Sequence, residues 1–314
     1  MNPGSTHAGT GPAVHAVLLN WNSYDFTAPC IASLKRSEYP YARIVVVDNG
    51  SKDGSIERLQ SEFNDPQVLF IRNAKNEGFS GGMNIGFKAA LEDGADMVFS
   101  VNNDTEVDPA CIGQLVRVLE EHPRCGVAGP TIYYYARSET IWQAGGSFVP
   151  SRVGISVPLK GKTAADIPDT PREVSFLTGC AILIRSSLLR TVGMLDTEYF
   201  FYGEDVDYDL RVTQSGSTLM YVPRASVWHK IDEVAKDRTS PYVLYHLARS
   251  TALLYHKRFG PPYRWYAYGV QLGIYTPFRA WQILKGGAGT ASLNAWVRGL
   301  LDGMRGRAAS APRG

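Results

Sequence analysis

Short apolar runs, each the length of one buried strand, alternate with longer mixed stretches from residue 14 to residue 101. The runs are rich in Val, Ile and Leu and occupy residues 14–20, 43–48, 68–71 and 97–101. The stretches between them have the length and polarity of surface helices. This alternation predicts a βαβ-based, mainly parallel sheet, and such sheets bind ligands at the carboxyl ends of their strands.

The second half of the chain repeats these patterns after an interruption. Residues 152–172 are rich in Pro, Lys, Thr and Gly with little periodicity, which predicts a mobile loop or an excursion from the sheet. The later segments predict a strand at 178–184, a helix at 186–192, a helix opening after Gly203, and a strand pair at 219–222 and 225–229. The whole pattern predicts an α/β fold with flanking helices and a C-terminal helical extension.

Composition divides the chain into three predicted parts. Residues 1–12 are small and polar, without the apolar core of a secretory signal, and predict a disordered leader. Residues 13–240 carry the α/β pattern, and residues 241–314 form a basic, amphipathic helical region. With 44% hydrophobic residues the chain can bury a substantial core. Its four widely spaced cysteines indicate neither disulfides nor a zinc site, so we expect a cytoplasmic protein.

The C-terminal region is cationic. From Lys257 onward it carries nine Lys or Arg residues against one acid, Asp302. The uncharged stretch from Trp265 to Phe278 is 14 residues long, shorter than a membrane span of about 20. Aromatic residues beside Arg and Lys favour peripheral contact with an anionic membrane, at the inner face of the plasma membrane. A helical cap or a homodimer surface explains the pattern equally well. We expect no nucleic-acid partner.

Two segments of the predicted sheet edge have the chemistry to hold a nucleotide. Asp48 ends a buried strand beside Asn49, where its carboxylate can accept the imide N–H of a base. An Asx-turn explains Asp48 equally well. Residues 76–86 place four glycines between a strand and a helix, which allows close backbone approach to a pyrophosphate. The segment matches neither a dinucleotide nor a P-loop pattern, and a purely structural glycine turn stays open.

Acidic side chains supply candidates for a metal site and a catalytic base. Asp104 follows a buried strand and suits a hard cation such as Mg²⁺ or Mn²⁺, although a simple turn also explains it. His229 either completes the metal ligands or is a structural histidine. After an aromatic stretch, Glu204 and Asp205 lie in a partly desolvated setting that suits a general base, with Asp205 the better candidate. We assign Asp207 to a helical ion pair with Arg211.

Five motifs in this order resemble the family 2 glycosyltransferases, and most closely the rhamnosyltransferase-like branch of bacterial cell-surface polysaccharide synthesis. The matching segments are Asn20-Trp-Asn22, Asp48-Asn-Gly-Ser51, Asn76-x-Gly-Phe-Ser-Gly-Gly-x-Asn84, Asn102-Asn-Asp-Thr105 and Tyr202-Gly-Glu-Asp-Val-Asp207. The resemblance implies a GT-A fold for residues 13–240. It also implies inverting, metal-dependent transfer from a nucleotide-diphosphate sugar to a hydroxyl of a glycan or lipid-linked acceptor.

The resemblance also implies roles for individual residues. Asp205 takes the place of the catalytic base, with Glu204 beside it, and Asp104 and His229 take the metal positions. Asn102 stands where the family's Asp-x-Asp motif has its first carboxylate. The expected donor-binding residues are Asn20, Asn22, Asp48, Asn49, Asn76, Gly78, Gly82, Asn84 and Asn103. The expected acceptor-binding residues are Trp142, Gly145, Thr178, Gly179 and Tyr202, and Trp142 is equally well explained as a core aromatic.

The resemblance favours dTDP-L-rhamnose as the donor, ahead of UDP-hexoses and UDP-galactofuranose. Two other classes of function stay open. A non-catalytic sugar-nucleotide-binding subunit fits the Asn at position 102, although Asp104 and Asp205 are both present. A nucleotidyltransferase shares strand-end carboxylates, but the segment after the first predicted strand lacks a basic activation loop.

Overall fold

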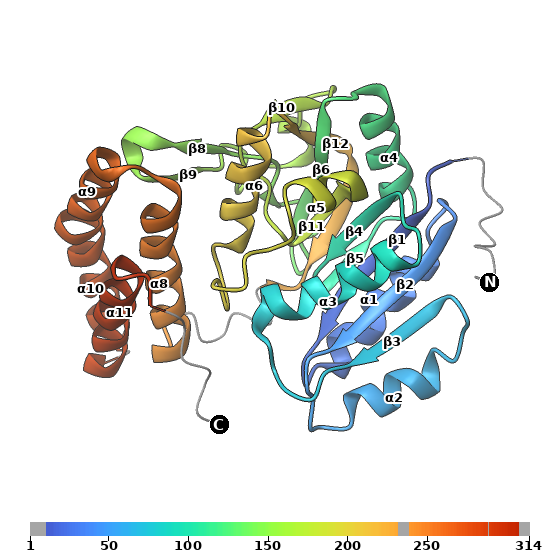
Figure 1. Ribbon diagram of the computed structural model, residues 1–314, viewed down its shortest axis with the longest axis horizontal. Helices are drawn as coiled ribbons and strands as arrows, with labels where there is room; N and C mark the ends of the chain where they lie inside the picture. Colours follow the sequence, from blue (N-terminus) through green and yellow to red (C-terminus); the bar gives the residue numbers. More distant parts are fainter. Residues whose placement is uncertain (1–10, 232–238, 288, 308–314) are drawn as a thin grey trace.

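An apolar strand buried on both faces lies at the centre of the molecule, and the rest of the sheet is built around it. This strand, β1, spans Val14–Asn20 and pairs in parallel with β2 on one side and β4 on the other. The computed structural model describes residues 11–231, 239–287 and 289–307. Helices cover both faces of the sheet, and a separate group of helices stands beside it (Figure 1).

The strands run β10-β12-β6-β11-β4-β1-β2-β3 across the sheet, with β5 beside β12 and β7 beside β6. Beyond β1, they are β2 Tyr41–Asp48, β3 Val68–Arg72, β4 Met97–Val101, β5 Thr105–Val107, β6 Cys125–Tyr134, β7 Ile141–Gln143, β10 Arg172–Val174, β11 Ala181–Arg185 and β12 Thr218–His229. The hairpin β8 Ser147–Val149 and β9 Gly154–Ser156 stands apart from this sheet.

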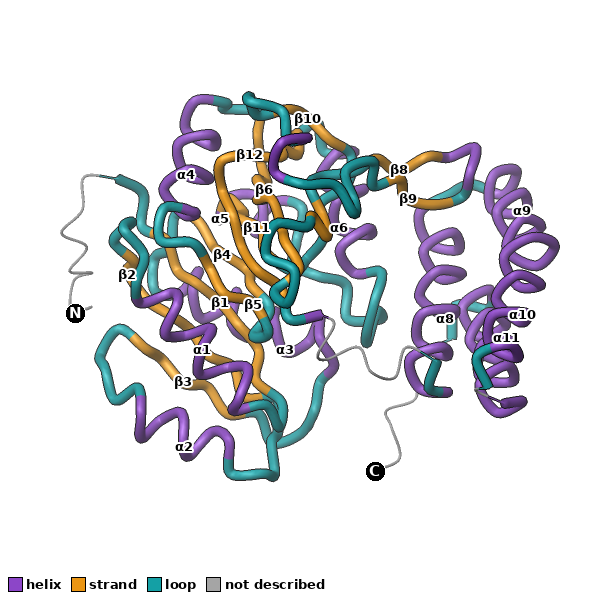
Figure 2. The backbone as a smooth tube through the Cα atoms, turned by 180° about the vertical axis from the view of Figure 1, so that it is seen from behind, coloured by secondary structure: helices purple, strands orange, loops and turns teal. Residues whose placement is uncertain are grey.

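The helices segregate into layers. Those around the sheet are α1 Tyr24–Lys35, α2 Ser55–Glu62, α3 Gly78–Glu92, α4 Cys111–Glu121, α5 Ser186–Thr191 and α6 Glu204–Gln214. One core joins α1, α2 and α4 to one face of the sheet, and a second joins α3, α5 and α6 to the other. Alternate residues of β1 enter the two cores, Leu18 the first and Val17 the second, because successive strand side chains point to opposite faces. Figure 2 shows the same layers from behind.

Several predicted elements need correction. The sheet is mixed, because β11 starts at the edge where β4 ends, with Ala181 opposite Val101, and therefore runs antiparallel. The predicted strand at 178–184 begins only at Ala181. The predicted pair at 219–222 and 225–229 is the single strand β12, whose register shifts between Val222 and Ser226 around a proline that cannot donate to the ladder.

The stretch predicted as a mobile loop, 152–172, contains ordered elements. It holds β9, the 3₁₀ turn Ala164–Asp166 and the start of β10. Thr163 and Asp166 close a capping box around that turn, which satisfies backbone groups that would otherwise be unpaired. The predicted leader lies outside the described residues up to position 10, and the predicted boundary at 240 falls just before a long helix.

The C-terminal helical unit consists of α8 Pro241–Arg258, α9 Pro261–Val270, the π-helical turn Gln271–Tyr275, α10 Thr276–Lys285 and α11 Gly289–Met304. Its core is separate from the two sheet cores and includes one residue from outside the helices, Val153 at the tip of the β8–β9 hairpin. The backbones of α8 and α11 approach closely because Gly299 and Gly303 carry no side chain. A Cβ atom on Gly303 would lie 2.2 Å from the carbonyl oxygen of Arg249. Among the described residues, no helix has the length and apolar character needed to cross a membrane.

The β8–β9 hairpin joins this unit to the sheet (Figure 1). Four tyrosine hydroxyls of the helical unit donate hydrogen bonds to four consecutive carbonyl oxygens at its tip, residues 150–153. The donors are Tyr263, Tyr266, Tyr275 and Tyr255, at 2.9, 2.7, 2.7 and 2.8 Å. Every carbonyl of the turn therefore has a partner, which fixes the hairpin to the helices.

Gly303→Ala should destabilise the protein, because the new Cβ meets α8 backbone that cannot swing aside as a side chain would. We expect the free energy of unfolding to fall by about 1–3 kcal/mol in thermal or urea unfolding. The matched control is Gly269→Ala in α9, where a Cβ meets open space and helix propensity rises by up to about 1 kcal/mol. Equal effects at the two positions would contradict the close α8–α11 packing.

Candidate active site

The carboxyl ends of β1, β2 and β4 bring the predicted donor residues to one edge of the sheet. Asn20 is the parallel register partner of Asp48, so the two side chains meet although 28 residues separate them. The amide nitrogen of Asn20 donates to Oδ1 of Asp48 at 2.9 Å, and the Asp48 Oδ2 atom accepts from the backbone N–H of Ser51. Asp48 is 3% exposed. Its carboxylate closes a turn and retains acceptor capacity, so a role in base binding stays a prediction.

Asn20 supports this edge from within the protein. It is fully buried, its amide also reaches the hydroxyls of Ser51 and Ser55, and its carbonyl accepts from Thr27. Its side-chain polar atoms are bonded within the protein, which favours a structural role, and its contact with a donor stays a prediction. Asn22 joins the same edge through its carbonyl oxygen, which accepts the N–H of Lys52 at 2.8 Å.

A second network fixes the segment before α3. The amide of Asn49 donates to the side-chain carbonyl of Asn76 and to the backbone oxygen of Gly78, both at 3.0 Å. The same Asn76 oxygen accepts the N–H of Gly78 at 2.8 Å. Gly78 has a φ of +75°, which favours glycine, and a Cβ there would lie 2.7 Å from Phe200. These residues shape the loop edge, and their contact with a donor stays a prediction.

Two members of the glycine segment have packing roles, and their contact with a donor stays a prediction. A Cβ on Gly82 would lie 2.4 Å from Leu19 of β1, so its absence lets α3 lie directly on the sheet. Asn84 holds the backbone of Leu195 with two hydrogen bonds, one donated and one accepted. These contacts favour the structural interpretation of this glycine segment.

The predicted metal residues meet beside the end of β4. Nε2 of His229, the last residue of β12, lies 3.1 Å from Oδ1 of Asp104. Burial alone would lower the pKa of His229, but the neighbouring Cys180 and Asp104 raise it to about 10. Oδ1 of Asn102 is buried without a hydrogen-bond partner in the described structure. Asn103 is turned to the hydroxyl of Thr27 at 2.8 Å.

These residues fit a divalent cation held jointly with a ligand. A carboxylate, a neutral imidazole and an unpaired amide oxygen are suitable donors, so a bound cation would have to displace the proton that Asp104 and Cys180 favour on His229. Across residues 11–231, 239–287 and 289–307, no group of three or more His, Cys, Asp or Glu side chains clusters to hold a metal ion by itself. The remaining ligands would have to come from Asn102, from water or from a bound diphosphate.

The predicted base lies at the start of α6 and is held by a loop. The carboxylate of Asp205 accepts the N–H of Gly179 at 3.3 Å and a hydrogen bond from the Thr178 side chain. Desolvation raises the pKa of Asp205 despite these bonds. The same loop reaches the metal residues, because the carbonyl of Cys180 accepts the N–H of Asn102 at 2.8 Å. One short loop therefore connects the predicted base, Asp205, to the segment that carries the predicted metal ligand Asp104.

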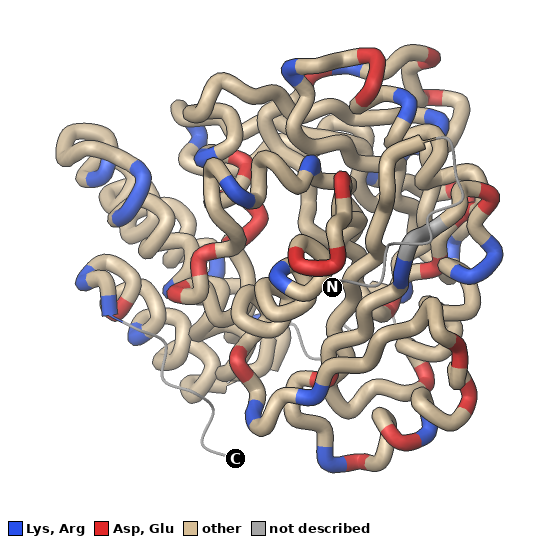
Figure 3. Tube along the Cα trace, turned by 45° about the vertical axis from the view of Figure 1, so that its right-hand side comes forward, with Lys and Arg blue, Asp and Glu red and all other residues tan. Residues whose placement is uncertain are grey.

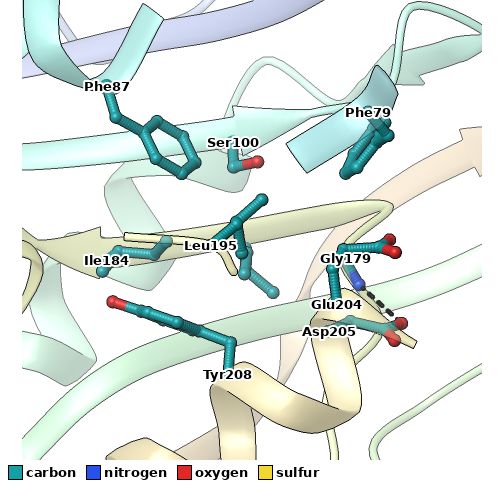
Figure 4. A pocket seen from close by; sticks show the side chains of 10 residues that line it. Phe79, Phe87, Ser100, Gly179, Ile184, Leu195, Glu204, Asp205 and Tyr208 are labelled. Atoms are coloured by element: carbon teal, nitrogen blue, oxygen red, sulfur yellow. Dashed lines mark hydrogen bonds between the residues drawn. The ribbon is translucent and has the colours of Figure 1, made fainter. Parts of the chain in front are cut away.

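Glu204 lies beside Asp205 but in a more enclosed position. Burial, followed by repulsion from Asp205, raises the pKa of Glu204 to about 8. Its Oε2 atom is buried without a hydrogen-bond partner in the described structure. Both carboxylates lie at one end of a cavity between α3, β4, β11 and α6, while aliphatic and aromatic side chains line its other end (Figure 4). Neutral Glu204 is thus unsuited to accept a proton at pH 7, which favours Asp205 as the base.

Two residues that position α6, Asp209 and Arg258, were not predicted from the sequence. Asp209, 1% exposed and one helical turn after Asp205, accepts the N–H of Leu177 at 2.7 Å. Burial raises the pKa of Asp209 well above its ordinary value. Asp207 makes the predicted pair with Arg211 at 2.8 Å and a further pair with Arg258 of α8. The four-residue spacing of Asp205 and Asp209 was a usable signal, whereas nothing in the sequence indicated the partner in α8.

The predicted acceptor residues lie in different settings. Thr178 and Gly179 touch Asp205, as described above. Trp142 packs edge-on against the His229 ring with centroids 4.7 Å apart and also contacts the sheet core. Gly145 has a φ of +66°, and a Cβ there would lie only 2.9 Å from Val174 and 3.0 Å from Tyr221. Both features indicate a glycine required by a structural turn. Tyr202 is 36% exposed, and its φ of +66° is unusual for a tyrosine next to α6.

Residues 16–193 match the model of glycosyl transferase family 2, so this chain belongs to that family. An N-acetylglucosaminyl-diphospho-decaprenol L-rhamnosyltransferase of Mycobacterium tuberculosis is 28% identical over 236 residues, which cover 69% of this chain and 76% of the relative. A dTDP-rhamnosyl transferase of Shigella flexneri is 22% identical and covers 79% of this chain and 81% of the relative.

Solved structures confirm the GT-A fold. A mannosyltransferase from Pyrobaculum calidifontis, in complex with GDP-Man and Mn²⁺, superposes with a TM-score of 0.58 at 13% identity, covering 94% of this chain and 87% of that one. GalNAc-T7 with UDP, GalNAc and Mn²⁺ gives a TM-score of 0.59 at 21% identity, over 69% of this chain and 43% of that one. The protein is thus a family 2 glycosyltransferase with rhamnosyltransferase relatives.

The stability of the fold should depend on pH through Glu204. Its pKa is about 8 in the folded protein against an ordinary 4.5, so the unfolded chain releases this proton first as the pH rises. The Glu204 contribution to the free energy of unfolding therefore falls from about pH 4.5 to about pH 8 and is constant above that. Glu204→Gln should raise the melting temperature at about pH 8 and change it little at about pH 5. An equal shift at both pH values would contradict the raised pKa.

Proposed function

We propose that this enzyme transfers L-rhamnose from dTDP-L-rhamnose to a hydroxyl of a lipid-linked or glycan acceptor, with inversion at the anomeric carbon. The observation that carries the proposal is the Thr178–Cys180 loop, which holds the Asp205 carboxylate at one end and the Asn102–Asp104 segment at the other. This arrangement supports the proposal, because the proposed base and the segment that carries the proposed metal ligand Asp104 are hydrogen-bonded to the same short loop. The names of the Mycobacterium and Shigella relatives support rhamnose as the sugar.

In the proposed reaction the acceptor oxygen attacks the anomeric carbon as the bond to the donor diphosphate breaks. The hydroxyl proton passes to Asp205, and dTDP leaves with the electron pair of the broken bond. Desolvation raises the pKa of Asp205, which makes it a stronger base than an exposed carboxylate. The hydrogen bonds from Gly179 and Thr178 hold the carboxylate in one orientation, which reduces the entropic part of the barrier.

Asp104, His229 and the side-chain oxygen of Asn102 would hold a divalent Mg²⁺ or Mn²⁺ ion together with the donor diphosphate. When bound, the cation would neutralise charge that accumulates on the leaving diphosphate. Trp142 packs on the His229 ring and fixes its orientation. Glu204, whose buried Oε2 has no partner in the described structure, has the chemistry to bond a sugar hydroxyl.

Replacing the base should reduce chemistry much more than donor binding. Asp205→Asn should lower kcat by about 10²- to 10⁴-fold, because general-base assistance is lost, while the dTDP dissociation constant changes little. Turnover is measured as dTDP release, and binding by calorimetry. The control is Asp169→Asn, on an exposed segment before β10, which should keep normal kcat. Normal turnover in Asp205→Asn would remove Asp205 as the base.

A nucleotide and metal screen tests the donor and cation together. We expect dTDP with Mn²⁺ at about 100 times its dissociation constant to raise the melting temperature by about 5–10 °C. UDP and GDP should give smaller shifts. In Asp104→Asn, most of the Mn²⁺-dependent part of this rise in melting temperature should be lost. Asp108→Asn should retain it, because Asp108 only accepts the Ala110 N–H and asparagine can do the same.

If UDP raised the melting temperature more than dTDP, the donor would be a UDP-sugar and not dTDP-rhamnose. Full retention of the Mn²⁺ effect in Asp104→Asn would contradict the metal assignment and leave the base assignment standing. The two halves of the proposal therefore fail separately.

A further inference from the structure

The outer side of the C-terminal helical unit carries a concentration of exposed large apolar side chains. We define the aromatic face as Trp265, Tyr266, Ile274, Phe278, Trp281 and Leu284. Their exposed fractions are 69, 48, 63, 55, 55 and 58%. Soluble surfaces seldom leave so many large apolar side chains together without a partner. We propose that the aromatic face docks the enzyme on an anionic lipid bilayer.

Helical spacing places the later residues of the aromatic face, from Ile274 to Leu284, along one side of the helical run. The helices α9 and α10 are joined through the π-helical turn Gln271–Tyr275 into one run along the edge of the molecule (Figure 1). Ile274, Phe278 and Trp281 are four and three residues apart, so they share one side of the run. The buried residues Ala267 and Ile283 belong to the core shared with α8 and α11. The aromatic face is therefore the side that no other described element covers.

The charge of the region selects an anionic partner. From Pro261 to Arg307 the chain has six Lys or Arg residues and one acid, Asp302. That acid is already engaged by the Tyr245 hydroxyl and by Arg307. Figure 3 shows Lys and Arg positions recurring along this unit with few acids among them. Each basic residue near an anionic bilayer strengthens binding, so the charge pattern complements such a surface.

The composition of the face suits the polar–apolar boundary of a bilayer. The Lys285 ammonium lies over the Trp281 ring at 4.9 Å, and Phe278 stacks on the same ring at 6.0 Å. Tryptophan, tyrosine and lysine each combine an apolar body with a polar end, and they prefer the headgroup level. A second copy of the chain is a poorer partner, because a twofold contact would bring this basic region against itself.

Docking at this face would hold the catalytic domain in a fixed orientation to the bilayer. The Tyr266 and Tyr275 hydroxyls bond the tip of the β8–β9 hairpin directly beside the aromatic face. At the base of the hairpin, the N–H of Gly146 donates to the Phe176 carbonyl at 2.9 Å, just before Thr178. A short, hydrogen-bonded path thus connects the docking surface to the loop that holds Asp205. The inference rests on this surface and is independent of which sugar the enzyme transfers.

Vesicle flotation of the full chain tests the inference. Vesicles of phosphatidylcholine with an equal part of phosphatidylglycerol should carry the protein, whereas vesicles of phosphatidylcholine alone should carry much less. The double variant Phe278→Ser/Trp281→Ser should lower the partition coefficient at least about tenfold, since two inserted rings are lost. Lys285→Glu should lower it at least about fivefold, because a cation at the lipid surface becomes an anion.

Lys88→Glu is the matched control, because Lys88 is an exposed lysine of α3 at the sheet and should leave partition unchanged. Thermal unfolding and light scattering of each variant exclude misfolding and report the oligomeric state. Absence of flotation, or equal flotation on both vesicle types, would overturn the inference. A wild-type dimer that the double variant converts to a monomer would also overturn it, by assigning the face to a second copy.

Discussion

The buried carboxylate of Asp207 is the interaction on which the arrangement of the site depends. Asp207 is fully buried in the first turn of α6 and pairs with Arg211 of the same helix and Arg258 of α8. Loss of either cation would leave a buried charge under-compensated, which typically costs several kcal/mol. Because Asp207 lies two residues after Asp205 in the same helical turn, this cluster fixes α6, with its candidate base, to the C-terminal helical unit.

The carboxylates along α6 have different tasks although they lie within two helical turns. Asp207 is neutralised by arginines, Asp209 holds the Leu177 N–H, and Asp205 holds the Gly179 N–H. The Oε2 atom of Glu204 has no hydrogen-bond partner among the described residues, and burial followed by repulsion from Asp205 raises the pKa of Glu204 to about 8. Environment separates chemically similar groups into structural and reactive ones, as the site of a general base requires. The Leu177–Cys180 segment is therefore held by two acids of α6, Asp209 at Leu177 and the proposed base Asp205 at Gly179.

The order of strands and helices around the sheet was predictable because each buried strand is a continuous apolar run. The ends of those runs also located Asp48, Asn102 and Asp104 correctly at one edge. Local patterns did not reveal the direction of β11, because an apolar run reads the same in a parallel or an antiparallel ladder. They also failed to distinguish glycines that approach a ligand from glycines such as Gly82 and Gly303, which permit helix packing.

The sequence by itself determined the family, the sheet edge that holds the site and the acids that can act there, since motif order and hydrophobic period are local properties. Only the tertiary structure decided that Asn20 and Asn84 bond within the protein, that Asp209 holds the site loop and that Arg258 reaches Asp207. Each of these outcomes depends on contacts between residues distant in sequence. Such contacts follow from how the layers pack, and no single segment encodes them.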